Sequence, residues 1–178
     1  MQSKLSETYE PAEDTFFLAE YVAKEKGQSA LEIGTGSGYL AKILEKNFEV
    51  VVATDVDFGA LKNQKTKLTN GVCCDCASAL GAKFDLIVCN MPYLPSNDIV
   101  DKTVDGGHDG LEIPQKIIES ASNCVKNGGK ILYLTSSLAN YQKLIEETES
   151  FGFLVRVLAT KKLFFEELIL VEATTILA

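Results

Sequence analysis

The chain of 178 residues has no tryptophan, a single histidine, four prolines and no long apolar run. Its apolar stretches, such as Phe84 to Val88 and Leu168 to Val171, are far shorter than the roughly 20 residues that cross a bilayer. The opening segment, 1–11, lacks the basic start and apolar centre of a secretion signal. We therefore expect a cytoplasmic protein without a membrane span.

Positive charge is also scarce. Seventeen lysines and arginines stand against twenty-five aspartates and glutamates, and the formal net charge is −8. The basic residues are scattered, so the chain should repel a phosphodiester backbone, which disfavours nucleic acid as a partner. A positively charged ligand would be favoured. With 46% hydrophobic residues, the length fits one domain over 1–178 with a sizeable core.

Cysteine and histidine offer little for disulfides, metals or proton transfer. The five cysteines are Cys73, Cys74, Cys76, Cys89 and Cys124. An odd number in mostly apolar surroundings indicates reduced thiols that act as small core residues. Strand alternation would point the neighbouring thiols of 73–76 to opposite faces, and no histidine completes a zinc site. His108 lies in a loop rich in glycine and aspartate, where we expect an exposed polar residue.

Strand-length apolar segments alternate with longer amphipathic segments, a pattern typical of a parallel sheet covered by helices on both faces. The predicted strands are 29–33, 50–54, 72–74, 84–90, 131–135, 153–159 and 163–171. The predicted helices are 13–26, 39–46, 58–67, 111–126 and one that begins behind Ser136 or Ser137 and ends at Gly152. The gap at 160–162 is too short for a crossover helix, so the last pair should be antiparallel. The stretch 91–110 is predicted to be a long loop.

A glycine-dense turn, Gly34-Thr35-Gly36-Ser37-Gly38, follows the first predicted strand. It falls at the carboxyl edge, where open α/β sheets bind ligands, and glycine lets the backbone approach a ligand closely. The dinucleotide fingerprint requires a sixth-position glycine, but that position is Tyr39. The turn therefore indicates a ligand other than NAD.

Three acidic residues follow neighbouring strands at the same edge. Asp55, about 20 residues after the turn, suits the two hydroxyls of a ribose. Glu32 is better placed for a cationic group than for a pyrophosphate, and Asp75 can accept from an adenine amino group. The alternative is that Glu32 and Asp55 only cap the adjacent helices.

The tetrapeptide Asn90-Met91-Pro92-Tyr93 ends the fourth predicted strand and so belongs to the same edge. An amide or amino nitrogen is a poor nucleophile, so an enzyme that alkylates it must hold it in line with the electrophile. The side-chain oxygen of Asn90 and the carbonyl of Met91 can each accept one N–H of an NH2 group, with Tyr93 as a flat wall. A plain turn after a strand is the alternative.

Four segments together resemble the HemK/PrmC-like class I methyltransferases. They are Tyr9-Glu10-Pro11-Ala12-Glu13-Asp14-Thr15, Leu31-Glu32-Ile33-Gly34-Thr35-Gly36-Ser37-Gly38, Asn90-Met91-Pro92-Tyr93 and Gly106-Gly107-His108-Asp109-Gly110. The chain is most similar to the short archaeal and eukaryotic branch, because no room precedes Tyr9 for the helical N-terminal domain of the bacterial enzymes. The resemblance implies a Rossmann-like, seven-stranded sheet. It also implies methylation of the glutamine of a Gly-Gly-Gln (GGQ) motif in a peptide chain release factor, with S-adenosylmethionine converted to S-adenosylhomocysteine.

The resemblance also implies roles for individual residues. Those expected to bind the cofactor are Thr15, Glu32, Gly34, Thr35, Gly36, Ser37, Gly38, Asp55, Asp75 and Asn90. Those expected to hold the glutamine are Asn90, Pro92 and Tyr93. Met91 replaces the proline usual in the family, which keeps the carbonyl but makes the turn less rigid. A small zinc-binding activator protein is a further implied partner, docking on a sheet edge for which we single out the cysteine-rich third strand.

Other functions stay open at this point. The same tetrapeptide serves enzymes that methylate the amino group of adenine in DNA or RNA, and a lysine could replace the glutamine. A cofactor-free binding module on the same fold is the non-enzymatic alternative. The acidic loop with Asp98, Asp101, Asp105 and Asp109 is either solvated or meets a basic protein, and we favour the second.

Overall fold

The structure is a computed structural model that describes residues 10–64, 68–101 and 103–176. Its helices are α1 (Glu13–Val22), α2 (Tyr39–Leu44), α3 (Phe58–Asn63), α4 (Glu112–Ser122), α5 (Tyr141–Ser150) and the short 3-10 helix η1 (His108–Gly110). Its strands are β1 (Gly27–Ile33), β2 (Phe48–Asp55), β3 (Gly71–Cys73), β4 (Phe84–Asn90), β5 (Leu94–Pro95), β6 (Asp105–Gly107), β7 (Val125–Ser136), β8 (Phe153–Lys162) and β9 (Glu167–Thr175). No helix in these ranges is long and apolar enough to cross a membrane.

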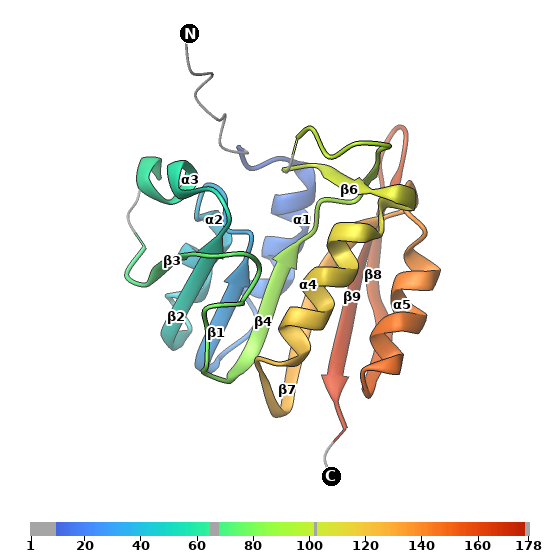
Figure 1. Cartoon of the computed structure of the whole chain (residues 1–178). Coiled ribbons are helices and arrows are strands. Elements are labelled where there is room, and N and C mark those ends of the chain that lie inside the picture. The colour runs from blue at the N-terminus through green and yellow to red at the C-terminus, as the bar shows by residue number, and fades with distance from the viewer. Residues whose placement is uncertain (1–9, 65–67, 102, 177–178) are drawn as a thin grey trace, which may run out of the picture.

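Seven strands form one sheet in the order β3-β2-β1-β4-β7-β9-β8 (Figure 1). From β3 to β7 the neighbours are parallel, whereas β9 runs antiparallel to both β7 and β8. The predicted seven-stranded, mostly parallel sheet with a reversed last strand is therefore confirmed. Because only β9 reverses, β8 runs with the parallel strands, and the turn from β8 to β9 lies at the edge where those strands end.

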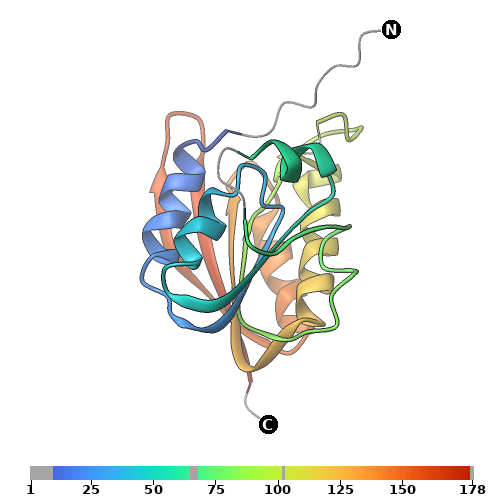
Figure 2. The same cartoon turned by 90° about the vertical axis from the view of Figure 1, so that its left-hand side faces the viewer.

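Helices cover both faces of the sheet, which Figure 2 shows nearly edge-on between α1 and α2 on one side and α4 and α5 on the other. Leu18 of α1 packs in one apolar cluster with Leu86 of β4. Ile118 of α4 packs in a second cluster with Ile87, the next residue of β4. Successive strand residues point to opposite faces, so the near-continuous apolar sequence of β4 supplies two cores at once.

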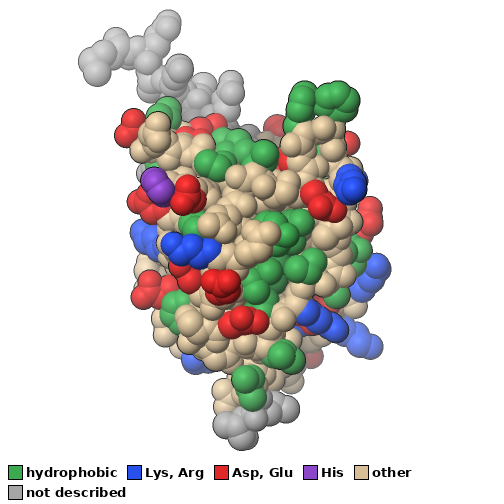
Figure 3. All heavy atoms as spheres, turned by 90° about the vertical axis from the view of Figure 1, so that its right-hand side faces the viewer, with side chains coloured by type: hydrophobic (Ala, Val, Ile, Leu, Met, Phe, Trp, Pro, Cys, Tyr) green, Lys and Arg blue, Asp and Glu red, His purple; other side chains and the backbone are tan. Residues whose placement is uncertain are grey.

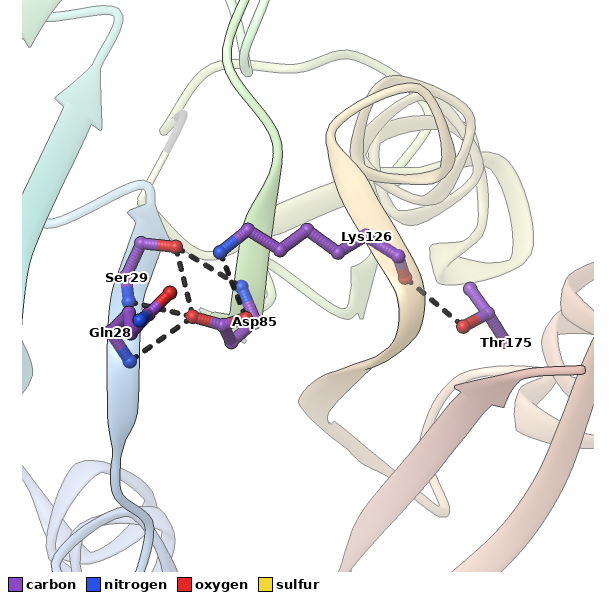
Figure 4. Close-up of polar contacts among 5 residues, drawn as sticks. All are labelled: Gln28, Ser29, Asp85, Lys126 and Thr175. Atoms are coloured by element: carbon purple, nitrogen blue, oxygen red, sulfur yellow. Dashed lines mark hydrogen bonds and ion pairs between the residues drawn. The ribbon is translucent and has the colours of Figure 1, made fainter. Parts of the chain in front are cut away.

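A polar cluster ties β1, β4 and β7 together at the amino edge of the sheet (Figure 4). The carboxylate of Asp85 accepts hydrogen bonds from the backbone N–H groups of Gln28 and Ser29, at 3.1 and 2.8 Å, and from Lys126 Nζ at 2.9 Å. Burial raises the pKa of Asp85, but the Lys126 and Ser29 hydrogen bonds outweigh it and hold the pKa below its usual value. The cluster fixes β1 beside β4, which brings their carboxyl ends together.

The turn between the last two strands lies later than predicted. The prediction of a turn at 160–162 is wrong, because β8 continues to Lys162, which pairs with Glu167 of β9. The turn is 163–166, where Leu163 N–H donates to the Glu166 carbonyl at 2.8 Å. Residues 160–162 are polar because they end the exposed edge strand β8, and their polarity resembled that of a turn. Residues 163–165 of the actual turn are apolar and resembled a strand.

Four predicted helices end earlier than their periodicity indicates. The helices predicted over 13–26, 39–46, 58–67 and 111–126 end at Val22, Leu44, Asn63 and Ser122. Of these stretches, 65–67 lies outside the described residues. The helix predicted over 111–126 is shorter because Val125 is already the first residue of β7 and pairs with Phe84. The spacing of these residues alone favours helix, but they are paired in the sheet.

The start of α5 also differs from the prediction. The helix begins at Tyr141, and Asn140 caps it by accepting a hydrogen bond from Lys143 N–H at 3.4 Å. Ser136, predicted as the cap, instead donates from its hydroxyl to the Glu166 carboxylate. Ser137 accepts from Glu167 N–H at 2.9 Å. Both serines therefore anchor the β8–β9 turn.

The stretch 91–110 is more ordered than the predicted loop. It contains β5 and β6, which pair in parallel, followed by η1. Leu94 N–H donates to the Val104 carbonyl at 2.9 Å, and Ser96 N–H donates to the Gly107 carbonyl at 3.0 Å. These bonds fold the stretch back over the end of β4.

All five cysteines are free thiols. Cys89 and Cys124 are buried, as predicted for small core residues, but Cys73 is exposed and Cys74 and Cys76 are half-buried. The difference arises because β3 has only three residues and lies at the edge of the sheet.

Candidate active site

The glycine turn after β1 has three glycines with positive φ angles. Gly34, Gly36 and Gly38 have φ values of 74°, 48° and 79°. The N–H groups of Gly34 and Thr35 both donate to the Thr54 carbonyl at 2.9 Å, which ties the turn to β2. A Cβ at Gly34 would meet no protein atom within 4 Å. The backbone is therefore bare on this side, as a cradle for a ligand requires.

Glu32, at the end of β1, is a buried carboxyl beneath this turn. Its Oε2 accepts hydrogen bonds from the Thr35 hydroxyl at 2.7 Å and from Ala41 N–H in α2 at 2.8 Å. Burial raises the pKa of Glu32 to about 8, with a further contribution from the nearby charge of Asp55, while the two hydrogen bonds oppose the shift. A cation bound beside Glu32 would stabilise its ionised form.

Replacing Glu32 with glutamine should stabilise the ligand-free protein in a pH-dependent way. Between the ordinary value of 4.5 and the folded-state pKa of about 8, the folded protein holds more protons than the unfolded chain, so wild-type stability falls as pH rises through this window. Glu32→Gln removes that dependence. We expect its melting temperature to exceed that of the wild type by about 4 °C or more at pH 8, and by much less at pH 5, near the lower end of this window.

Thermal unfolding at the two pH values measures this effect. Glu49→Gln, an exposed position on β2, is the matched control and should follow the wild type at both. A Glu32→Gln melting temperature equal to that of the wild type at pH 8 would show that the buried carboxyl imposes no cost.

Asp55, at the end of β2, points back to the glycine turn. Its Oδ2 accepts from Gly36 N–H at 2.8 Å, and its Oδ1 accepts from Asp57 N–H at 2.9 Å. The capping residue of α3 is Asp57, which accepts from Gly59 N–H at 2.7 Å. Helix capping therefore accounts in part for Glu32, through Ala41, but not for Asp55.

Asn90, the last residue of β4, has its side chain oriented by α1. Its Nδ2 donates to Asp14 Oδ2 at 3.1 Å and to Thr15 Oγ1 at 3.3 Å. Its Oδ1 is buried and has no hydrogen-bond partner within the described residues. A buried acceptor without a donor is costly, so this oxygen is available to accept an N–H group from a ligand.

The next three residues form one wall of the site. Met91 is buried, and its N–H donates to the Leu134 carbonyl of β7 at 3.2 Å. Tyr93 is also buried. The motif is thus fixed to the sheet on one side, and both Pro92 and Tyr93 line the cavity on the other.

A second glycine motif, Gly106-Gly107-His108-Asp109-Gly110, packs directly on this wall. A Cβ at Gly106 would lie 2.7 Å from the Pro92 carbonyl oxygen, and one at Gly110 would lie 2.3 Å from the Tyr93 carbonyl oxygen. Gly110 also has a φ of 67°. Side chains are therefore excluded at both positions, because the backbone of 106–110 supports the backbone of the tetrapeptide.

A single cavity of about 950 Å³ joins the glycine turn to the tetrapeptide, a size within the range of small-molecule sites. The predicted residues that line it are Thr15, Glu32, Gly34, Thr35, Gly36, Ser37, Asp55, Asp75, Asn90, Pro92 and Tyr93. Gly38 is not among the lining residues. It precedes α2 as its N-cap, and a Cβ at this position would lie 3.1 Å from the Gln64 side chain.

Asp75 and His108 differ in their relation to the cavity. Asp75 lines the cavity, but its exposed carboxylate also forms an ion pair with Lys116 of α4. His108 lies outside the cavity lining with a largely exposed side chain, 3.3 Å from Asp109, as predicted for a surface residue. In the described part of the chain, no group of three His, Cys, Asp or Glu side chains is placed to hold a metal ion.

The lining is strongly acidic. Seven carboxyl side chains line the cavity: Asp14, Glu32, Asp55, Asp57, Asp75, Asp101 and Glu166. None of the described lining residues is lysine, arginine or histidine. Sequence reasoning did not assign Asp14 or Glu166 to the site. Asp14 directly precedes Thr15, which was predicted to bind the cofactor, so its place in the sequence was an indication. Glu166 gave no such indication, because only the fold brings it from the far end of the chain to this edge.

Comparison with known proteins places the chain in a family. The methyltransferase small domain model matches residues 12–165. The chain belongs to the methyltransferase small domain family. The family and the enzyme class predicted from the sequence, a methyltransferase, are therefore confirmed.

Relatives of this methyltransferase share much of its length. A Methanocaldococcus jannaschii protein named as a protein N5-glutamine methyltransferase is 33% identical, over 94% of this chain and 91% of its own. The release factor glutamine methyltransferase of Streptococcus pneumoniae is 32% identical over 68% of this chain, but only 51% of its own. This chain therefore spans about half of that bacterial relative.

Solved structures share the fold. Mtq2 in the Mtq2–Trm112 complex of E. cuniculi, described as responsible for methylation of the eRF1 translation termination factor, is 26% identical with a TM-score of 0.81, covering 94% of this chain and 98% of that one. The Thermus thermophilus 16S rRNA methyltransferase RsmC, solved with AdoMet and guanosine, is 18% identical with a TM-score of 0.69, covering 96% of this chain and 45% of that one. The second likeness shows the fold alone.

Proposed function

We propose that this methyltransferase transfers a methyl group from S-adenosylmethionine to the side-chain amide nitrogen of the glutamine in a release factor GGQ motif. The observation that carries the proposal is the buried Asn90 Oδ1, which has no partner among the described residues and lines the same cavity as the glycine turn. That oxygen can accept one N–H of a primary amide.

The cavity fits a cationic methyl donor. S-adenosylmethionine supplies an electrophilic methyl group on a positively charged sulfur. The acidic lining attracts such a cation, and the bare backbone at Gly34 leaves room for it. Glu32 and the glycine turn would hold the amino acid end, Asp55 the ribose hydroxyls, and the region of Asp75 the adenine.

On the acceptor side, the chain works by positioning. An amide nitrogen has a delocalised lone pair, so the rate depends on holding it in line with the methyl group. Asn90 Oδ1 and the Met91 carbonyl would each accept one amide N–H, while Asp14 and Thr15 keep Asn90 from turning. Tyr93 would pack against the amide plane. The proton leaves to water after the methyl arrives, so no strong base is needed.

Protein rather than nucleic acid is the favoured acceptor. The described cavity lining has seven carboxyl groups and no cation, which opposes a phosphodiester backbone. Curated relatives are named release factor glutamine methyltransferases, and the Mtq2–Trm112 complex is described as methylating a termination factor. We extend that substrate to this chain.

We also propose a small activator protein as a partner, again from the comparison with Mtq2. The similar Mtq2 was solved in complex with Trm112. In this chain β3 forms one edge of the sheet with the exposed Cys73, and the half-exposed Val56 follows its neighbour β2. This edge offers the apolar strand surface that we singled out for such a protein.

Methyl transfer to a purified release factor tests the function. The chain, alone and co-expressed with a candidate activator, is incubated with labelled S-adenosylmethionine and the release factor, its GGQ glutamine→alanine variant, or nucleic acid. We expect label in the wild-type factor only, with mass spectrometry locating one added methyl on the glutamine. Label in nucleic acid alone, or in the alanine variant at a lysine, would overturn the proposed acceptor.

A further inference from the structure

The turn between β8 and β9 carries two exposed aromatic side chains. Phe164 and Phe165 are 92% and 85% exposed, and their rings contact each other edge to face with centroids 4.6 Å apart. The turn stands out as the hydrophobic projection at the upper right of Figure 3. Two neighbouring phenylalanines at a turn contribute nothing to the core, so their exposure calls for another role.

This turn belongs to the rim of the cavity. Figures 1 and 2 show it rising past the carboxyl edge, at the same end of the molecule as the segment between β5 and β6. Glu166, the residue after Phe165, lines the cavity. The Ser136 hydroxyl at the end of β7 donates to its carboxylate. The Ser137 hydroxyl oxygen accepts from Glu167 N–H, and Ser137 N–H donates to the Glu167 carbonyl, both at 2.9 Å. The phenylalanines are therefore held at a fixed place beside the site.

The segment between β5 and β6 supplies a third apolar side chain at the rim. Val100 is 87% exposed and lines the cavity together with Asp101. The Asp105 carboxylate accepts from the N–H groups of Val100 and Asp101 at 2.9 and 2.8 Å, so this position is also fixed. Hydrogen bonds from the Thr103 side chain and backbone hold the pKa of Asp101 below its usual value. The rim thus combines exposed apolar groups with negative charge.

We propose that Phe164, Phe165 and Val100 form a docking rim for the protein substrate, which packs apolar side chains of the substrate that lie beyond the residues next to the methyl-accepting glutamine. Asp101 and Glu166 face basic residues of the same segment. This inference rests on the proposed function and adds the surface by which the substrate is recognised.

The charge of the rim and its position beside the cavity both favour a protein substrate as its occupant. Val100 and Glu166 line the same cavity as Asn90, so a polypeptide that delivers a glutamine to Asn90 can pack against the rim. A second copy of the chain would bring its own acidic rim against this one, and each copy has a formal net charge of −8. A basic and apolar segment of a protein substrate complements both features of the surface.

Kinetics with two substrates of different length test the docking rim. The double variant Phe164→Ser/Phe165→Ser is compared with the wild type on the full-length release factor and on a short peptide limited to the residues next to the GGQ glutamine. We expect the KM for the release factor to rise about tenfold or more with kcat little changed, because docking groups act on binding. Activity on the short peptide and the affinity for S-adenosylmethionine should stay at wild-type values.

A matched control removes exposed apolar side chains on β8, away from the turn. Leu154 is 70% exposed and Val157 is also exposed, and neither lines the cavity. The variant Leu154→Ser/Val157→Ser should keep the wild-type KM for the release factor. An equal rise in KM for both double variants would show a general loss of apolar surface and overturn the rim.

The remaining outcomes separate the rim from the proposed function. If the wild type methylates the release factor and Phe164→Ser/Phe165→Ser has the same KM, the docking rim is wrong and the function stands. If the wild type methylates neither substrate, with or without the activator, the proposed function fails and the rim fails with it. If light scattering shows a wild-type dimer that the variant converts to monomer, the rim binds a second copy instead.

Discussion

Replacing Asn90 with alanine should lower the rate of methyl transfer by about 100-fold or more while S-adenosylmethionine still binds. The substitution removes the buried Oδ1 acceptor at the end of β4 and leaves the glycine turn, Glu32 and Asp55 untouched. Single-turnover rates with the release factor and calorimetric titration with the cofactor measure the two effects separately.

Two further variants sharpen the result. Asn90→Asp keeps an oxygen acceptor but loses the Nδ2 donor to Asp14 and places two carboxylates side by side, so it should also be strongly impaired. Asn123→Ala removes an exposed asparagine whose Nδ2 donates to the Glu119 carbonyl, and it should behave as the wild type. Full activity in Asn90→Ala would remove Asn90 from the mechanism.

Gly110→Ala should nearly abolish activity although residue 110 carries no functional side chain. The added Cβ would lie 2.3 Å from the Tyr93 carbonyl oxygen and 2.8 Å from the Ala139 Cβ, so the tetrapeptide backbone must move. A displacement of about 1 Å in a positioning group costs on the order of 100-fold in rate. Transfer assays and thermal unfolding of the same preparation record both consequences.

Gly152→Ala is the control for backbone strain. Gly152, after α5, has a φ of 87°, and a Cβ there would meet no protein atom within 4 Å. Both variants incur the cost of about 1 kcal/mol for an alanine in the left-handed region, but only Gly110→Ala also disturbs the site. If the two variants lose stability equally and keep full activity, the contact of the second glycine motif with Tyr93 has no part in positioning.

The sequence was most informative where local pattern and fold agree. Parallel strands place their carboxyl ends at one edge, so the residues at the ends of the first, second and fourth predicted strands could be assigned to a common site without coordinates. The alternation of apolar segments likewise predicted the seven-stranded sheet. These inferences need only the direction of each strand, which periodicity and connection length supply.

Where the sequence misled, tertiary pairing decided against local pattern. The stretch 125–129 looks like the end of a helix, yet Val125 pairs with Phe84 as part of β7. The turn 163–166 is apolar and resembled a strand. Asp14 and Glu166 were not recognised because each acts through a partner distant in sequence, Asn90 and Ser136 respectively. Such contacts carry no periodic signal.

The acidic lining also determines which abundant metabolites the cavity rejects. A nucleoside triphosphate shares its adenosine with the methyl donor but brings several negative charges. Those charges would enter beside seven carboxyl groups, with no lysine, arginine or histidine among the described lining residues to neutralise them. Discrimination against ATP therefore needs no additional residue, because the carboxyl groups that attract a sulfonium ion repel a triphosphate.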